Sequence, residues 1–509
     1  MSSVFSRRRL LAAGAGLAMA LALPGPAIWP LVFLVPGLLA RALADSRGWR
    51  AFRAGWLAGF VQWAFAVAWV VIVLHRYGHL PLPFALLGWL LMAAIMGLTW
   101  GAAGWAGAHL PAAWRLWALP VFLVAMELLQ RLPPWIFPWN PAAALATAAP
   151  ALMLPLPVVG AAGLSLLIYL TGAGLDRLAT RDGRKAGIAA LAAAAAIFGL
   201  AAAVAPRFRP SGPAIKVAAL QPNVPLEVRW DADNLASIEE KVWRLTDEAR
   251  RAGAGWIVWP ESAVPRLVER DPHYRAGLER WARRHGAWLL LGSIGLGAAP
   301  DEYYNSVFAV SPGGLAPWRY DKVNLVPFGE YVPLAGRVAA LRALVREVGS
   351  FTPGRSALPL PGPAGPTGVA ICYEVAFPAL VAAEVELGAT VLTTITNDGW
   401  YGDSAAPRQH LALAILRAAE TRRYLVRAAN TGISAVIDPY GRVVERLEFG
   451  REGFIAADVV PGAGITPAVR FGAWLRGAIG LLAVLLFAAG RRQSWPIRGS
   501  RTPGRGNNA

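Results

Sequence analysis

The chain has 509 residues, of which 56% are hydrophobic and only 16% are charged. This composition excludes an ordinary soluble globular protein, which carries more charge, and indicates a membrane protein of two or more domains. The net charge of +18 does not indicate nucleic acid as a partner, because no DNA- or RNA-binding motif is present and the basic residues flank apolar runs.

Eight apolar segments are candidates for membrane spans, and most are long enough to cross a bilayer. Seven precede residue 210 and the eighth lies near the C-terminus: 10–23, 27–44, 55–74, 82–106, 115–130, 155–175, 186–205 and 471–489. Residues 132–150 are also apolar, but prolines interrupt them. We therefore expect a re-entrant or interfacial segment there, buried in protein or facing a cavity.

The distribution of Lys and Arg among the loops predicts the orientation. Basic residues cluster before the first span, between spans two and three, after span four, between spans six and seven, and after the last span. These positions share one side if there are eight spans, and the positive-inside rule makes that side, with both termini, cytoplasmic. We expect a multi-pass protein of the bacterial inner membrane, with the long insert between spans seven and eight in the periplasm.

The first basic cluster has a second interpretation. The run Ser6-Arg7-Arg8-Arg9-Leu10-Leu11 resembles a twin-arginine signal, and cleavage would leave seven spans. Six further apolar segments follow directly, which favours an uncleaved helix. The expected regions are therefore a seven-span membrane domain over 1–210, an insert over 211–466, and a last span with a basic tail over 467–509.

The insert alternates short β-rich runs with amphipathic helices. We expect strands at 215–220, 256–259, 288–291, 306–310, 367–371, 390–395 and 434–437, and helices at 234–252, 272–285, 377–385 and 410–424. That alternation is typical of an α/β domain whose sheet faces are covered by helices.

Three motifs in the insert carry chemistry. Glu261 follows a predicted strand, Lys322 stands in the run Tyr320-Asp321-Lys322, and the single cysteine, Cys372, ends a strand-like run. Alone, they suggest a solvated strand end, a surface charge and a small buried hydrophobe. Together they supply a base, an oxyanion stabiliser (with the backbone N–H after the cysteine) and a thiol nucleophile. Because a predicted helix follows Cys372, and its positive end favours negative charge, we expect a thiolate.

These three motifs, in this order, resemble the Glu-Lys-Cys triad of the nitrilase, or carbon–nitrogen hydrolase, superfamily. With membrane spans on both sides, and with the runs 325–333 and 396–403, essentially the whole chain resembles the bacterial apolipoprotein N-acyltransferase family. The resemblance implies an α-helical membrane bundle of about eight spans with an inserted α/β nitrilase-like domain, an αββα sandwich.

The resemblance also implies a reaction and its residues. A fatty acyl chain would pass from a membrane phospholipid, through a cysteine thioester, to the N-terminal α-amine of a diacylglyceryl-cysteine apolipoprotein, as the last step of lipoprotein maturation. The implied residues are Glu261, Lys322 and Cys372 as the triad, Glu330 as a second essential carboxylate, and Trp230, Tyr373 and Glu374 as supporting or substrate-positioning groups. One departure is Val323-Asn324, where many relatives carry His. No cofactor or metal is expected, since the six histidines show no ligand spacing.

Three questions stay open at this stage. The same triad would serve a membrane-bound nitrilase-type amidase acting on a small amide, and a binding module or flippase-like scaffold without activity is a third possibility. Residues 334–348 place apolar side chains on one helical face with arginines elsewhere. This pattern fits either an interfacial helix that binds lipid or an ordinary helix packed on its own domain.

Overall fold

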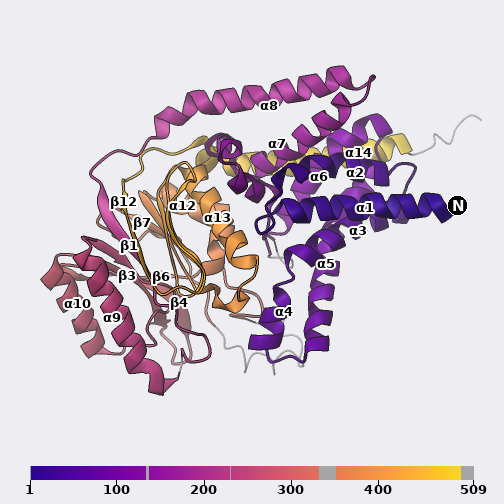
Figure 1. The fold of residues 1–509 in the computed structure, drawn as a ribbon. Helices are drawn as coiled ribbons and strands as arrows, with labels where there is room; N and C mark the ends of the chain where they lie inside the picture. Colours follow the sequence, from indigo (N-terminus) through magenta and orange to yellow (C-terminus); the bar gives the residue numbers. More distant parts are fainter. Residues whose placement is uncertain (1, 133–136, 230, 332–350, 495–509) are drawn as a thin grey trace, which may run out of the picture.

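The computed structural model describes residues 2–132, 137–229, 231–331 and 351–494. A bundle of helices, formed by the N-terminal part of the chain and the last helix, lies beside a region of two β-sheets with their own helices (Figure 1). Helices α1, α8 and α14 run across the view, whereas α4 and the nearby part of α5 stand at a steep angle to them (Figure 1). The N-terminus lies at the end of the bundle farthest from the sheets (Figure 1).

The bundle contains both long helices and short irregular turns. Its elements are α1 (Ser2–Ala22), η1 (Trp29–Leu34), α2 (Val35–Ala42), α3 (Trp49–Ala66), α4 (Val70–Ile72), η2 (Val73–Tyr77), α5 (Leu82–Ala108), α6 (Ala112–Leu129), η3 (Ala142–Ala148), η4 (Pro150–Met153), α7 (Leu156–Leu178), α8 (Arg184–Val204), η5 (Ala205–Phe208) and α14 (Pro467–Ser494). Every segment expected to span the membrane therefore contains helix, although not every one is a single long helix.

Five helices in the described residues are long and apolar enough to cross a membrane: α5, α6, α7, α14, and α8 extended to Phe208. Helix α3 and the segment Val70–Tyr77 would make a sixth span, although they are bent by 62°. The expected count of eight is not reproduced. Arg7, Arg8 and Arg9 lie within α1, while Pro30 and Pro36 divide the second segment into a 3-10 turn and a short α-helix.

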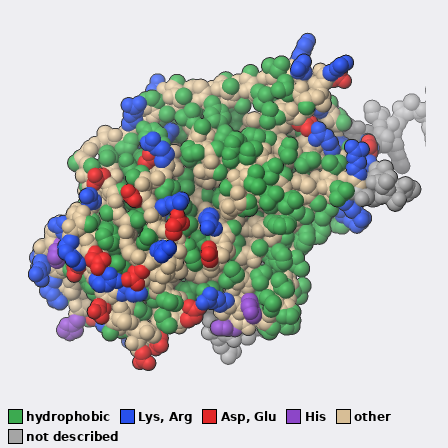
Figure 2. Space-filling view, in the orientation of Figure 1, with side chains coloured by type: hydrophobic (Ala, Val, Ile, Leu, Met, Phe, Trp, Pro, Cys, Tyr) green, Lys and Arg blue, Asp and Glu red, His purple; other side chains and the backbone are tan. Residues whose placement is uncertain are grey.

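An apolar surface covers the middle of the bundle. Large hydrophobic side chains are exposed along α5 and α14, among them Phe84, Leu87, Leu91, Trp474, Leu481 and Val484. Lys and Arg side chains gather at the end of the bundle remote from the sheets, and mixed charges cover the sheet region (Figure 2). An apolar band between two charged ends is the surface that a bilayer requires.

Both β-sheets are mixed: in the first, antiparallel strands flank the parallel strands β1-β2-β3, and in the second, β7, β8 and β9 are parallel and β10 and β11 antiparallel. The first runs β12-β1-β2-β3-β4-β5, with β6 paired to β4, and the second runs β11-β10-β9-β8-β7. The strands are β1 (Ile215–Gln221), β2 (Trp256–Val258), β3 (Trp288–Leu296), β4 (Tyr303–Ser311), β5 (Gly314–Leu315), β6 (Tyr320–Asp321), β7 (Thr367–Ile371), β8 (Val391–Thr396), β9 (Leu425–Ala429), β10 (Ser434–Ile437), β11 (Val443–Leu447) and β12 (Gly453–Val459).

Side chains alternate between the two faces of each strand, and the two sheets with their covering helices form a four-layer sandwich. On β1, Ala218 and Leu220 pack with α9 (Leu235–Arg251) and α10 (Pro272–His285), whereas Val217 and Ala219 belong to a second core shared with β7, β8 and β9. The other face of the second sheet is covered by α12 (Pro378–Glu386) and α13 (Ala406–Thr421) (Figure 1). The expected α/β sandwich is therefore present, because successive strand residues point to opposite faces.

All seven expected strands are present, and five further strands were missed. The misses are β5, β6, β9, β11 and β12. Two have a clear cause: β11 is an exposed edge strand with the charged sequence Val-Val-Glu-Arg-Leu, and β9 follows directly on α13 and contains Arg427. Helix α13 begins and ends about one turn before the expected 410–424, so its last predicted residues belong to the approach to β9.

Helix α13 joins the sheets to the bundle. All of its residues except Arg408 are buried, and a continuous apolar core runs from the bundle through α13 into the second sheet. The middle of the proline-interrupted segment, with Trp139 and residues 142–146, packs into the same core, and Trp139 is only 1% exposed. Its expected burial in protein is confirmed.

Close helix contacts in the bundle depend on glycine, and this generates a stability prediction. A Cβ at Gly59 of α3 would lie 2.6 Å from the Cβ of Trp100 on α5, whereas a Cβ at Gly199 of α8 would meet nothing within 4 Å. We expect Gly59→Val to lower the melting temperature in detergent, since overpacking costs about 1–3 kcal/mol. The matched control Gly199→Val should leave it nearly unchanged, and equal losses would contradict this packing.

Candidate active site

Cys372 occupies a strained corner directly after β7. Its φ is +53°, in the left-handed region that a residue with a Cβ rarely adopts, and its side chain is 7% exposed. The chain then turns through a 3-10 helix, Cys372–Ala376, before α12 begins. Such strain persists only where surrounding contacts impose it, which is common at functional sites.

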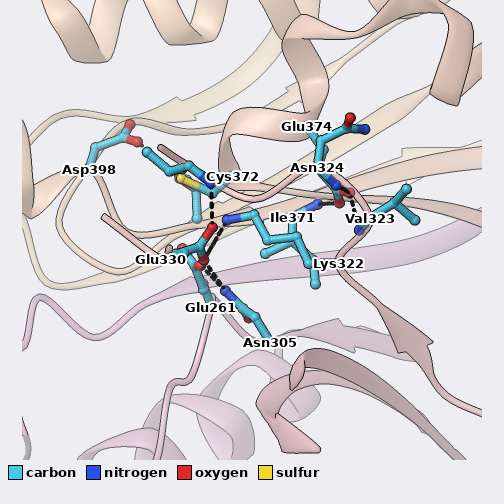
Figure 3. A network of polar contacts seen from close by, with 12 residues as sticks. Glu261, Asn305, Lys322, Val323, Asn324, Glu330, Ile371, Cys372, Glu374 and Asp398 are labelled. Atoms are coloured by element: carbon cyan, nitrogen blue, oxygen red, sulfur yellow. Dashed lines mark hydrogen bonds and ion pairs between the residues drawn. The ribbon is translucent and has the colours of Figure 1, made fainter. Parts of the chain in front are cut away.

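A lysine between two carboxylates lies beside this corner (Figure 3). Lys322 is 1% exposed, and its Nζ donates a hydrogen bond to Glu330 Oε1 at 2.8 Å and lies 3.9 Å from Glu261 Oε1. The pairing of β6 with β4, in which Asp321 faces Ser306, sets the position of Lys322. Glu261 comes from the loop after β2, so residues remote in sequence meet here.

Asn305 of β4 links the two carboxylates. Its Nδ2 donates to Glu261 Oε1 at 2.7 Å and to Glu330 Oε1 at 2.9 Å (Figure 3). Glu330 also accepts from the backbone N–H of Val326 at 2.8 Å, and Arg229 donates to the backbone carbonyls of Glu261 and Ser262. Both carboxylates are thus held toward Lys322. Asn305 was missed because nothing in a strand sequence marks one buried amide as a site residue.

The pKa values of both Lys322 and Cys372 are raised, which favours the charged form of the lysine and the neutral form of the cysteine. Burial disfavours the charged form of Lys322, but Glu330 and Glu261 outweigh it and raise its pKa above the usual range. For Cys372, burial and the Glu261 carboxylate raise the pKa to about 12, although Lys322 opposes them. The expected thiolate is therefore wrong for the free protein. Burial outweighs the short helical turn after the cysteine, so the thiol needs a base.

Glu374 connects the corner to the lysine loop. It is 0% exposed, and its carboxylate accepts hydrogen bonds from the backbone N–H groups of Ile371, Val323 and Asn324, at 2.7–2.9 Å, and from the Tyr320 hydroxyl at 2.9 Å. Burial raises the pKa of Glu374 to about 7, although the hydrogen bonds from these donors act to lower it. Because Val323 and Asn324 contribute backbone groups here, their departure from the family sequence leaves these contacts intact.

Aromatic side chains from the bundle stand behind the corner. Tyr373 is 2% exposed and stacks against Phe137 and Trp139, with ring centroids 6.3 and 6.4 Å apart. Trp139 in turn donates from Nε1 to Gln409 of α13 at 2.8 Å. This places Tyr373 at the junction with the bundle. Trp230 and the segment 334–348 lie outside the described residues.

A second buried network supports the backbone of Cys372. His410 of α13 lies with Nε2 2.9 Å from the Cys372 carbonyl oxygen and Nδ1 2.9 Å from Asp398, and Arg427 of β9 donates to Asp398 at 2.6 Å. All three side chains are fully buried. Sequence analysis did not select His410 or Asp398 as site residues, although Asp398 lies in the quoted run 396–403.

Comparison with known proteins places this arrangement in a family. The sequence model described as "Carbon-nitrogen hydrolase" matches residues 216–464, and the one described as "Apolipoprotein N-acyltransferase N-terminal domain" matches residues 15–174. A curated protein of Azotobacter vinelandii named apolipoprotein N-acyltransferase is 36% identical over 499 residues, covering 94% of this chain and 93% of its own. The chain belongs to the apolipoprotein N-acyltransferase family.

Other members show similar coverage. Proteins of the same name from Geobacter metallireducens and Pseudomonas aeruginosa are each 32% identical, over 96% of this chain and 96% of their own. Among solved structures, a nitrilase-superfamily protein of Saccharomyces cerevisiae is 19% identical with a TM-score of 0.39, covering 57% of this chain and 97% of its own.

The raised pKa of the cysteine in this N-acyltransferase family member is testable by alkylation. Cys372 is the only cysteine, so iodoacetamide labelling reports on it alone. With a pKa of about 12, the thiolate fraction and the labelling rate should rise roughly tenfold per pH unit from pH 7 to pH 10 without a plateau. The unfolded chain should level off near the usual value of about 8.5. A plateau below pH 8 in the folded protein would mean that the thiolate already exists at rest.

Proposed function

We propose that this chain transfers a fatty acyl group from a membrane phospholipid to the N-terminal α-amine of a diacylglyceryl-cysteine apolipoprotein. The observation that carries the proposal is the convergence of Cys372, Lys322, Glu261 and Glu330 at a corner that packs directly against the apolar helix bundle. The family supports the same reaction, since the curated relatives bear the name apolipoprotein N-acyltransferase.

In the first half-reaction, Glu261 removes the proton from Cys372 as the sulfur attacks the acyl ester carbonyl of the phospholipid. The Lys322 ammonium stabilises the oxyanion of the tetrahedral intermediate. The ester C–O bond then breaks, Glu261 returns the proton to the departing alkoxide, and a lysophospholipid leaves. Cys372 keeps the acyl group as a thioester.

In the second half-reaction, the neutral α-amine of the apolipoprotein attacks the thioester. Glu261 takes a proton from the nitrogen and passes it to the cysteine sulfur as the C–S bond breaks, so the resting thiol is restored. Glu330 and Asn305 act as positioning residues, since they hold Lys322 and Glu261 toward each other. The raised pKa of Cys372 favours its departure as a protonated thiol.

Exclusion of water separates this reaction from the amidase alternative. Water would hydrolyse the thioester, and a soluble amidase needs no apolar bundle. Cys372 is 7% exposed, and Tyr373, Phe137 and Trp139 cover one side of its corner. The bundle contact favours a lipid donor, and turnover by water in place of an amine would favour the amidase.

The proposal includes an arrangement in the inner membrane. Residues 1–210 and 467–509 form the membrane domain with up to eight spans, residues 211–466 form the periplasmic catalytic domain, and both termini are cytoplasmic. Arg47 lies in the connection after α2, Arg115 in the first turn of α6 and Arg177 in the last turn of α7. All three line one common pocket, which supports a shared basic side.

The orientation is testable by reporter fusion. Alkaline phosphatase, which is active only outside the cytoplasm, should be active when fused after Arg207 and inactive when fused near the end of α14 at Arg492. The reverse pattern would overturn the orientation and, with it, access to exported lipoproteins.

The thioester is testable by intact mass. After incubation with phospholipid and no amine acceptor, the wild-type protein should gain one fatty acyl group, because Cys372 is the only thiol. The Cys372→Ala variant should gain none. Adding a synthetic diacylglyceryl-cysteine peptide should then remove the acyl group from the wild type and place it on the peptide amine.

The same measurement examines the other triad members. Glu261→Gln and Lys322→Met should each slow acyl gain by ~100-fold or more, as is typical when a base or an oxyanion donor is lost. Burial of Lys322 beside two carboxylates makes its loss a folding risk, so the melting temperature must be compared in parallel. Near-normal acylation in either variant would remove that residue from the proposed triad.

A further inference from the structure

A cavity lies at the end of the bundle remote from the sheets. It has a volume of about 780 Å³ and is formed where the α2–α3 connection, the α5–α6 connection and the end of α7 meet. This volume is in the range that holds a small ligand or a lipid headgroup. The reaction described above does not use this cavity, because none of its lining residues belongs to the site around Cys372, Lys322 and Glu261.

The cavity lining carries an excess of positive charge. It includes Arg41, Arg47, Arg115 and Arg177, but only two carboxylates, Asp45 and Asp176. Both carboxylates already have partners: Asp176 pairs with Arg41 at 2.6 Å, and Asp45 with Arg8 at 3.3 Å. Within the described ranges, no carboxylate pairs with Arg47, Arg115 or Arg177. Asp45 attracts Arg115 electrostatically, but the lining has four arginines and two carboxylates, so an anion in the cavity would meet an excess of positive charge.

Arg115 is held in place as a preformed donor. Its guanidinium donates to the backbone carbonyls of Leu43 at 2.9 Å and Leu110 at 3.4 Å, which fixes it between the two connections. Its Nε is shielded from solvent and has no acceptor in the described structure. A buried N–H without a partner is unfavourable, and an oxygen of a bound anion would satisfy it.

The edge of the cavity lies at the depth of the membrane interface. Trp49, next to the lining residue Gly48, is 67% exposed, and Trp114, next to Arg115, is 62% exposed. Exposed tryptophans of membrane proteins concentrate at the level of the lipid headgroups. Large apolar side chains are also exposed along α5 and α14 of the bundle. An anion reaching this cavity with acyl chains attached could leave those chains in the bilayer.

We propose that this cavity binds the phosphate of an anionic phospholipid headgroup, such as that of phosphatidylglycerol, separately from the acyl donor at the triad. Arg47, Arg115 and Arg177 contact the phosphate oxygens, and the acyl chains lie along the bundle beside Trp49 and Trp114. Basic pockets between helices at the membrane surface are suited to such headgroups. Free inorganic phosphate has the same anionic chemistry, so the test must separate the two sources.

The experiment measures lipid binding to the full chain in an uncharged detergent by native mass spectrometry. The test variant is Arg47→Gln with Arg177→Gln, and the matched control is Arg181→Gln with Arg184→Gln, which removes equal charge from the exposed α7–α8 connection outside the lining. We expect the affinity for phosphatidylglycerol to fall roughly tenfold or more in the test variant, since each basic group near an anionic headgroup strengthens lipid binding. The control should stay within about twofold of the wild type.

Two arms use only the wild-type chain and remain decisive if the test variant does not fold. Raising the salt concentration should weaken phosphatidylglycerol binding, because ions screen the attraction. Phosphatidylcholine, which has a phosphate but no net charge, should bind more weakly than phosphatidylglycerol.

Three results would overturn the proposal: equal losses in the test and control variants, equal binding of phosphatidylcholine, or binding that salt does not change. If inorganic phosphate at the same concentration displaces phosphatidylglycerol completely, the cavity is a site for a soluble anion and the lipid assignment is wrong. None of these outcomes depends on acyl transfer, so failure here would leave the proposed reaction untouched.

Discussion

The buried ammonium group of Lys322 is the interaction on which the rest of the site depends. An unpaired charge at this depth would be strongly unfavourable, and two neighbouring carboxylates would repel each other. The contacts of Lys322 with Glu330 and Glu261, together with the Asn305 amide, remove both problems at once. The chain brings Lys322 and Asn305 together by pairing β6 with β4. The register of the sheet therefore places the lysine where its charge is neutralised.

That charge balance also affects the cysteine. Burial and Glu261 raise the pKa of the Cys372 thiol, while Lys322 opposes them. The His410 contact to the Cys372 carbonyl and the Glu374 contacts to the lysine loop hold the strained corner from two directions.

The bundle shapes the site as much as the sheets do. Helix α13 is covered on one side by the second sheet and on the other by bundle elements, and it carries both His410 and Gln409. The aromatic side chains of Phe137 and Trp139, from an irregular segment that is tolerated in a membrane protein only when buried, pack against Tyr373, the residue that follows Cys372. A change in the bundle near this segment would therefore be transmitted directly to the cysteine corner.

Patterns that are local in sequence determined much of this protein. Apolar runs located the helices, alternating runs located the strongest strands, and the motifs around Glu261, Lys322 and Cys372 identified a family that comparison confirms. Tertiary structure alone decided the rest. Arginines within α1, prolines in the second segment and the α3–α4 bend leave five or six clear candidates instead of the eight expected spans. Asn305 and His410 gained their roles, and Cys372 its raised pKa, from partners remote in sequence, because burial and electrostatic contact depend on proximity in space.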